Sequence, residues 1–224
     1  TLMSLGAYNV LAKPLVSPFE SSSSFSFDGS DDVITTTADS TLATKTYSFW
    51  AKSTHTSTQA VFSHGGQHIG GFLFNSANSP LLYTASSVYQ YWEDNPAQDS
   101  GEWAHWLVVI VADDITACEL YCNGVKQTKT SSANSGSMMA YSTGIQIGGA
   151  SQQGSYFDGS LTDFAIFSGD QSALADELYN NGRPGSLLHH STLDHHWRMG
   201  EGTLTGGKRD GDDNLLFDQS KNGG

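Results

Sequence analysis

Aromatic and acidic side chains follow one another between positions 89 and 95 in a pattern that suits sugar binding. Tyr89, Tyr91 and Trp92 offer flat rings, on which the apolar face of a sugar can pack. Asp94 and Asn95 come directly after them and offer groups that hydrogen-bond hydroxyls. We therefore predict a ligand-binding surface at these five residues. The alternative is structural: Tyr89 and Tyr91 alternate into the core, and Trp92 closes its end.

Histidines are the second group of side chains that could do chemistry. Six of the eight histidines form two sets, which are His64 with His68, and His189 and His190 with His195 and His196. Imidazole is a common zinc ligand, so either set could contribute to a zinc site. The chain has no Cys/His quartet with the spacing of such a site. We therefore favour turn and surface positions for these histidines over metal binding.

The net charge of the 224-residue chain, −13, restricts its partners. An acidic surface repels phosphate backbones and anionic lipid headgroups, so we expect neither nucleic-acid binding nor membrane insertion. The longest apolar run, Trp106–Ala112, is too short to span a bilayer and is predicted to be a buried strand. Thr1–Gly6 lacks a basic region before an apolar core, so we expect no signal peptide.

The composition predicts a globular β protein. Hydrophobic residues make up 38% and aromatic residues 11%, which is enough for a core, whereas only 15% are charged. Cys118 and Cys122 are the only cysteines. Four residues along a strand span about 13 Å, which is beyond the reach of a disulfide, so we expect two buried free thiols.

Short alternating segments recur about every ten residues, which is typical of a sandwich or barrel. Asn123-Gly124 is a strong hairpin signal. A single helix is predicted over Ser172–Gly182, with Ser172 as its N-cap and Gly182 as its terminator. The predicted strands lie within Phe25–Phe27, Tyr47–Lys52, Ala60–Ser63, Gly71–Asn75, Pro80–Gln90, Trp103–Val111, Ala117–Cys122, Thr143–Gly148 and Gly159–Phe167.

The tetrapeptide Phe-Asp-Gly-Ser occurs twice, at Phe27–Ser30 and at Phe157–Ser160. Each copy lies beside an alternating apolar run, so each is interpreted as a strand that meets an Asp-Gly turn. One copy comes early and the other late, which predicts that the first and last core strands are neighbours. Asp31 and Asp32 follow the first copy and are interpreted as turn formers.

These segments and further motifs resemble, in the same order, the LamG-like, concanavalin A-like jelly-roll family. The resemblance covers roughly 25–182 and is carried by Phe25–Val33, Tyr47–Trp50, Glu102–His105, Leu120–Gly124, Ile145–Gly148 and Phe157–Phe167. It implies an all-β jelly-roll sandwich of two antiparallel sheets with one short C-terminal helix. We assign 1–24 to an N-terminal arm or edge strand and 25–224 to the jelly-roll domain, with 183–224 as its closing strand and tail.

The tail contains one departure from the family order. Trp197–Gly202 and Phe217–Gly223 resemble an opening that usually precedes the first Phe-Asp-Gly strand. We expect this segment to join the same sheet from its other end. The alternative is that it begins a second copy of the domain.

The resemblance also implies a metal. In this superfamily an aspartate at the position of Asp163 often binds a structural Ca²⁺ together with carbonyls of the Phe-Asp-Gly turn, here at Asp28 and Gly29. Ca²⁺ takes six to eight oxygen ligands, which closely spaced carbonyls can supply. Asp28, Gly29 and Asp163 are therefore the predicted calcium ligands. The alternative is that Asp28 and Asp158 only form Asx turns.

We expect no catalytic residues. Retaining glycosidases on a related jelly-roll scaffold place two carboxylates on one strand face at i, i+4, close enough to act together. Glu102 and Glu119 each lack such a partner, and Asp113 and Asp114 lie at a hairpin turn. The sequence also contains no Gly-x-Ser-x-Gly elbow and no phosphate-cradling loop.

The expected function is therefore non-catalytic binding or adhesion, with a glycan as the ligand. Chains with this motif series resemble phage and other virion structural proteins, which implies display on a virion surface as a capsid decoration, fibre or tail-associated protein. The expected partners are cell-surface glycans or other virion proteins, with a homo-oligomer as a further option. Two alternatives stay open: a purely structural virion protein that uses the jelly roll for protein–protein contacts, and an extracellular location.

Overall fold

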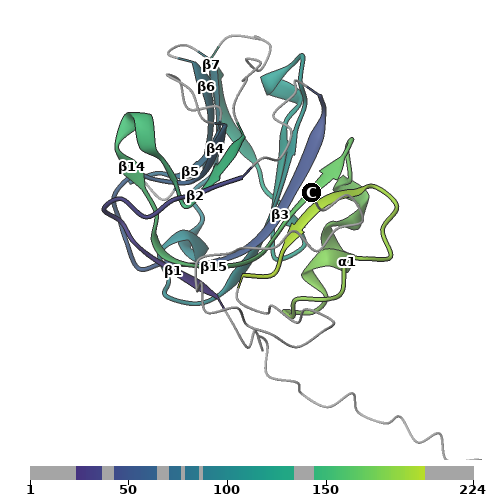
Figure 1. The fold of residues 1–224 in the computed structure, drawn as a ribbon. Helices are drawn as coiled ribbons and strands as arrows, with labels where there is room; N and C mark the ends of the chain where they lie inside the picture. Colours follow the sequence, from purple (N-terminus) through teal and green to yellow (C-terminus); the bar gives the residue numbers. More distant parts are fainter. Residues whose placement is uncertain are drawn as a thin grey trace, which may run out of the picture.

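Two large antiparallel sheets pack face to face in the computed structural model (Figure 1). The structure describes residues 24–36, 43–64, 71–76, 79–85, 88–133 and 144–199. The predicted arm up to residue 23 and the predicted tail from residue 200 onward lie outside the described residues. The expected all-β sandwich with one short helix is confirmed.

The first sheet is built around its closing strand. Its order is β1 (Phe25–Asp28), β15 (Asp158–Ser168), β3 (Lys45–Lys52), β8 (Ala104–Ile110), β9 (Glu119–Cys122) and β10 (Val125–Lys126), and β16 (Leu193–Trp197) also pairs with β15. β15 is long enough to pair with two strands along one side. β1 takes positions 158–161 of that side, and β16 takes positions 164–167.

The second sheet faces the first across the core. Its order is β11 (Lys129–Ala133), β7 (Val88–Trp92), β6 (Leu81–Ala85), β5 (Gly71–Phe74), β4 (Gln59–His64), β12 (Ile145–Ile147) and β2 (Ile34–Thr35). A small third ladder joins β13 (Gly149–Ala150) and β14 (Ser155–Tyr156). The short 3₁₀ turns are η1 (Pro96–Gln98), η2 (Ile115–Ala117), η3 (Ser151–Gln153) and η4 (Ser172–Leu174).

The two Phe-Asp-Gly-Ser copies lie directly against each other. In the antiparallel register of β1 and β15, Phe27 is opposite Gly159 and Asp28 is opposite Asp158. The Phe27 and Phe157 rings meet edge to face, with centroids 6.1 Å apart. The predicted pairing of the first and last core strands is confirmed.

A β-bulge in β15 changes which face its side chains occupy. Leu161 and Phe164 both point into the core although they are three positions apart, which regular alternation would not allow. Three steps along β15, from Thr162 to Ala165, match two along β3. Asp163 lies at this bulge with a φ of 49°, a left-handed conformation that aspartate tolerates better than most residues.

Aromatic rings fill the space between the sheets. Alternation in β3 directs Tyr47 and Phe49 inward, where Tyr47 stacks on Phe62 at 4.7 Å and Phe49 on Phe164 at 5.6 Å. Trp50 points to the opposite face of β3. The inner face of each sheet is thus apolar, and burial of this surface is the main driving force for folding.

The helix covers the outer face of the first sheet (Figure 1). Leu178 of α1 (Ala175–Tyr179) packs there with Leu107, Val109 and Phe167. Trp50 stacks on Tyr179 of the helix, with centroids 6.1 Å apart. β3 is therefore covered on both of its faces.

The helix boundaries differ from the prediction. Ser172 lies inside the 3₁₀ turn η4 rather than at an N-cap, and Asp170 accepts a hydrogen bond from its backbone N–H at 2.8 Å. The helix ends at Tyr179 because Asn180 adopts a left-handed conformation, with a φ of 46°, before Gly182 is reached. Asparagine takes here the role that the sequence pattern assigns to glycine.

Both cysteines are free and buried, as predicted. Burial raises the pKa of Cys118 to about 11 and that of Cys122 to about 12. Both thiols therefore stay protonated near neutral pH and act as small apolar groups.

Candidate functional site

β7 presents the predicted aromatic residues on two different faces. Trp92 points inward, is fully buried and belongs to the main core. Tyr89 and Tyr91 point to the outer face of the second sheet and are only partly buried. Adjacent residues of a strand lie on opposite faces, so Trp92 cannot share a surface with Tyr91. The structure thus moves Trp92 from the predicted binding surface to the core and leaves both tyrosines accessible.

A third tyrosine extends this surface. Tyr83 of β6 is directly opposite Tyr89, and Leu81 is directly opposite Tyr91. The Tyr89 and Tyr91 rings meet edge to face, with centroids 5.3 Å apart. We call Tyr83, Tyr89 and Tyr91 the tyrosine row.

Buried apolar side chains support the tyrosine row. The three tyrosines pack against a cluster on the outer face, formed by Ala60, Leu73, Leu81 and Ala150. The register continues from Leu73 through Leu81 and Tyr91 to Ser131 of β11, whose side chain is exposed. The row is thus a set of half-exposed rings that its neighbours hold in place.

Polar groups lie at the end of β7. Asp94 is exposed, and its carboxylate accepts a hydrogen bond from the Ser79 hydroxyl at 2.6 Å. Asn95 has a structural role: its side-chain oxygen accepts a hydrogen bond from the Ala97 N–H, and its amide donates to Gln127 at 3.0 Å. Asp94 remains accessible for a ligand, whereas the hydrogen bonds of Asn95 are used to form the loop.

The predicted calcium ligands do not come together. Asp28 and Gly29 lie at the turn after β1, and the Gly29 N–H donates to the Phe157 carbonyl at 3.0 Å. Asp163 lies five positions along β15 from Asp158, the residue opposite Asp28, which is about 16 Å of strand. Its carboxylate accepts a hydrogen bond from His196 at 3.2 Å and lies 3.5 Å from Arg198 Nε. Asp163 therefore belongs to a separate buried polar group.

Two other carboxylates lie beside Asp28 instead. Ligand oxygens of Asp28, Asp31 and Asp32 are all within 4.8 Å of one another, and all three residues are exposed. Asp32 accepts a hydrogen bond from the Asp28 N–H at 3.0 Å, and Asp28 accepts one from the Ser30 N–H at 2.8 Å. Asp32 thus shapes the turn, as the sequence predicts, and Asp28 forms the Asx turn that was the alternative to calcium binding. The turn also concentrates negative charge.

Three histidines are buried in the described part of the chain: His196 lies beside Asp163, and His64 and His105 are core residues. His64 hydrogen-bonds the Tyr47 hydroxyl at 3.0 Å, and burial together with the charge of Lys45 lowers its pKa to about 4. His105 hydrogen-bonds Ser48 at 2.8 Å, and burial lowers its pKa to about 3. His68 lies outside the described residues, so the structure does not place it relative to His64.

The family of the chain follows from a comparison with protein-family models. The laminin G model described as the concanavalin A-like lectin/glucanases superfamily matches residues 27–174, which is more than half of the chain. The chain belongs to this superfamily. The match begins in β1 and ends with η4, so it spans both sheets and the tyrosine row. A comparison with curated protein sequences found no match.

Solved structures with this superfamily fold agree with the assignment. A putative carbohydrate binding protein from Bacteroides ovatus has a TM-score of 0.56 at 14% identity, over 88% of this chain and 56% of that protein. The heptameric SAP-like pentraxin from Limulus polyphemus has a TM-score of 0.50 at 18% identity, over 69% and 80%. Domains LG4-5 of the mouse laminin alpha1 chain have a TM-score of 0.51 at 6% identity, over 69% and 44%. The chain thus spans about half the length of the Bacteroides and laminin structures, and these likenesses show the fold.

One residue of the tyrosine row, Tyr83, was not among the predicted ligand-binding residues. Tyr83 precedes the predicted cluster by six residues, and only the hairpin register places it opposite Tyr89. The spacing of Leu81 and Tyr83 at i, i+2 inside the predicted strand region Pro80–Gln90 is the signal that could have identified it.

Among the described residues, no helix is long and apolar enough to span a bilayer.

Proposed function

We propose that the chain is a non-catalytic glycan-binding module whose ligand packs on the tyrosine row. The observation that carries this proposal is the orientation of Tyr83, Tyr89 and Tyr91 on one outer sheet face. Sugar rings have apolar faces that pack on aromatic rings, and partly exposed tyrosines combine such a ring with a hydroxyl for hydrogen bonding. The described α-helix packs on the other sheet.

The polar residues near the tyrosine row suit a ligand rich in hydroxyl groups. Asp94 and Glu93 are exposed where β7 ends, and Ser131 is exposed on the neighbouring strand β11. At the rim of the rings, carboxylates can accept hydrogen bonds and hydroxyls can both accept and donate them. The ligand class that fits is a neutral or cationic glycan, because the chain carries a net charge of −13.

Two further observations support binding without catalysis. The superfamily name includes lectins, and the Bacteroides ovatus structure is described as a putative carbohydrate binding protein. The superfamily also includes glucanases, but the one Asp/Glu pair at i, i+4, Asp28 and Asp32, does not lie on one strand face, because β1 ends at Asp28.

A glycan array with two variants tests the proposal. The Tyr89→Ala, Tyr91→Ala double variant is expected to weaken binding to every wild-type hit at least about tenfold, because it removes the stacking surface. Tyr121→Ala is the matched control. Tyr121 is also a half-buried strand tyrosine, but it lies on the first sheet and its hydroxyl donates to Glu119 at 2.7 Å.

Circular dichroism should show both variants folded, because the tyrosines of the row are partly exposed. Equal binding by the double variant and the wild type would refute the tyrosine row as the site. The absence of any hit for the wild type would refute glycan binding itself.

We further propose display on a virion, where the partners are cell-surface glycans or neighbouring virion proteins. The support is the resemblance of the motif series to phage and other virion structural proteins. Immunogold labelling of purified virions with an antibody against the folded chain tests this setting. In the structural alternative the tyrosine row lies in a subunit interface. Light scattering would then show a homo-oligomer that Tyr89→Ala, Tyr91→Ala dissociates, and the array would show no hit.

We also propose a structural Ca²⁺ at the turn after β1, with ligands from Asp28, Asp31 and Asp32 in place of Asp163. Their clustered oxygens fit the all-oxygen preference of Ca²⁺. Ca²⁺ at 100 times its Kd should stabilise the fold by about 2.7 kcal/mol, which raises the Tm by roughly 5–10 °C.

Differential scanning calorimetry with and without chelator measures this effect. Asp31→Asn should abolish the Ca²⁺ response, and Asp113→Asn, which changes an exposed aspartate in another turn, should keep it. A response that survives in Asp31→Asn would place the ion elsewhere.

A further inference from the structure

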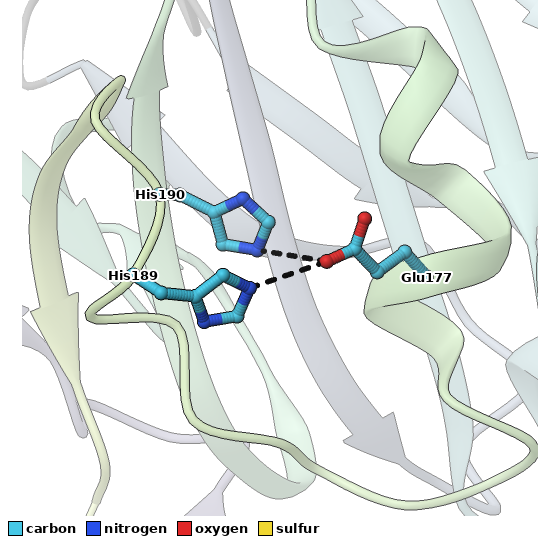
Figure 2. A group of neighbouring side chains, drawn as sticks. All are labelled: Glu177, His189 and His190. Atoms are coloured by element: carbon cyan, nitrogen blue, oxygen red, sulfur yellow. Dashed lines mark hydrogen bonds and ion pairs between the residues drawn. The ribbon is translucent and has the colours of Figure 1, made fainter.

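Two histidines and a glutamate converge where the helix meets the turn before β16. Glu177 comes from α1, and His189 and His190 come from the turn (Figure 2). His189 Nε2 lies 3.2 Å from Glu177 Oε1, and His190 Nε2 lies 3.6 Å from the same oxygen. One donor atom of each of the three residues lies within 4.8 Å of the others. Both imidazoles therefore point at one carboxylate oxygen.

His190 has a buried nitrogen that the described protein groups leave unsatisfied. Its side chain is 9% exposed, and its Nε2 atom makes no hydrogen bond in the described structure. The distance of 3.6 Å to Glu177 is too long for a hydrogen bond. A buried polar atom without a partner is costly, so it points to a missing binding partner at this position.

The rest of the site holds His190 in this orientation. Its ring meets the buried Phe167 ring edge to face, with centroids 5.8 Å apart. The His189 and His190 rings lie against each other with centroids 4.0 Å apart and a tilt of 37°.

The donor types and spacings select the kind of ion. Zinc bonds of 2.0–2.2 Å in a tetrahedron place neighbouring ligand atoms about 3.3–3.6 Å apart. The two distances from Glu177 Oε1, 3.2 and 3.6 Å, match this separation. Imidazole nitrogen suits Zn²⁺ and related transition metals, whereas Ca²⁺ and Mg²⁺ prefer oxygen ligands alone.

We propose that Glu177, His189 and His190 form a binding site for Zn²⁺ or a related transition-metal ion, which ties the turn before β16 to helix α1. The site lies beyond residues 27–174, the part that the superfamily model matches. It is also separate from the tyrosine row, which lies on the other sheet. Three protein ligands leave a coordination position for water or another donor.

Titration calorimetry of the untagged, chelator-treated full chain with zinc chloride tests the site. We expect one Zn²⁺ per chain at this site. The Tm should rise when Zn²⁺ is added and return to its metal-free value when chelator is added. Glu177→Gln and His189→Gln should each weaken Zn²⁺ binding at least about tenfold, as loss of a supporting group at metal sites does. Both side chains are more than half exposed, at 55% and 62%, so neither change should prevent folding.

His55→Gln is the matched control. His55 also pairs with a carboxylate, since its Nδ1 lies 3.0 Å from Asp158, but no second histidine of the described residues joins that pair. Its loss should leave Zn²⁺ affinity unchanged. Co²⁺ should give the visible absorption of a tetrahedral complex in wild type and His55→Gln, and not in Glu177→Gln. Three results would overturn the proposal: no Zn²⁺ binding by the wild type, unchanged binding by Glu177→Gln and His189→Gln, or a Tm response to Ca²⁺ that depends on Glu177.

Discussion

Replacing Gly148 with alanine is expected to destabilise the fold by about 2–5 kcal/mol, from left-handed strain and core overpacking together. Gly148 has a φ of +85°, which an alanine adopts only with strain. A Cβ at this position would also overlap the Phe27 ring, whose Cζ would lie 2.9 Å away and whose Cε1 and Cδ1 would lie closer. Phe27 cannot move freely because it is buried and packs on Phe157. Urea unfolding of both proteins measures the difference.

Gly154→Ala separates the two causes. Gly154 also has a positive φ, +61°, but no atom lies within 4 Å of the added Cβ. The free energy of unfolding of this variant should fall by only about 1 kcal/mol, which is the contribution of backbone strain alone. In a Phe27→Leu background the cost of Gly148→Ala should fall, because the smaller side chain relieves the overlap. If Gly148→Ala and Gly154→Ala lose the same free energy, the overlap with Phe27 has no energetic effect.

Lowering the pH from 7 to 5 is expected to destabilise the fold by about 4 kcal/mol through His64 and His105 together. Both have an ordinary pKa of 6.5 in the unfolded chain, against about 4 and about 3 in the folded protein. Below pH 6.5 the unfolded chain therefore binds protons that the folded protein does not. Each histidine costs about 2 kcal/mol at pH 5, from about 1.36 kcal/mol for each pH unit below 6.5. His190, whose pKa is also lowered, adds a contribution of the same sign.

Single-residue variants measure how much of this loss of stability comes from His64 and how much from His105. His64→Gln and His105→Gln should each reduce the slope of unfolding free energy against pH by about 1.4 kcal/mol per unit between pH 5 and 6. His55→Gln, which removes a histidine that is not buried, is the control. Chemical unfolding in this pH range avoids the carboxylates, which titrate mainly at lower pH. If the slopes of His64→Gln and His105→Gln both equal that of the wild type, the two histidines are not buried in the neutral form.

Local patterns in the sequence were sufficient for most of the architecture. Alternation identified β3 and β15, and the two Phe-Asp-Gly-Ser copies predicted that β1 and β15 are neighbours. Strands without an apolar pattern were missed. β11, with the sequence Lys-Thr-Ser-Ser-Ala, lies at a sheet edge and is mainly exposed, so hydrogen bonding to β7 alone defines it. The formation of such a strand depends on pairing with its neighbour, so its own sequence does not indicate a strand.

The candidate sites were harder to predict because they depend on register. Trp92 follows Tyr91 directly, so the period of two already separates these residues, although the sequence does not show which one faces the core. Asp163 and Asp28, which were predicted to share a calcium ion, do not lie side by side for a similar reason. The register of β1 on β15 places Asp158 opposite Asp28, and the bulge directs Asp163 to His196. Neither the register nor the bulge can be derived from local spacing.

The division of one side of β15 between β1 and β16 has a consequence for solubility. β15 has eleven residues, and an open side of that length would offer unpaired backbone groups to strands of other molecules. β1 covers positions 158–161 and β16 covers positions 164–167, so two short strands from distant parts of the sequence protect it together. Detachment of either one exposes only about half of this edge, and the other half stays protected against intermolecular strand pairing and aggregation.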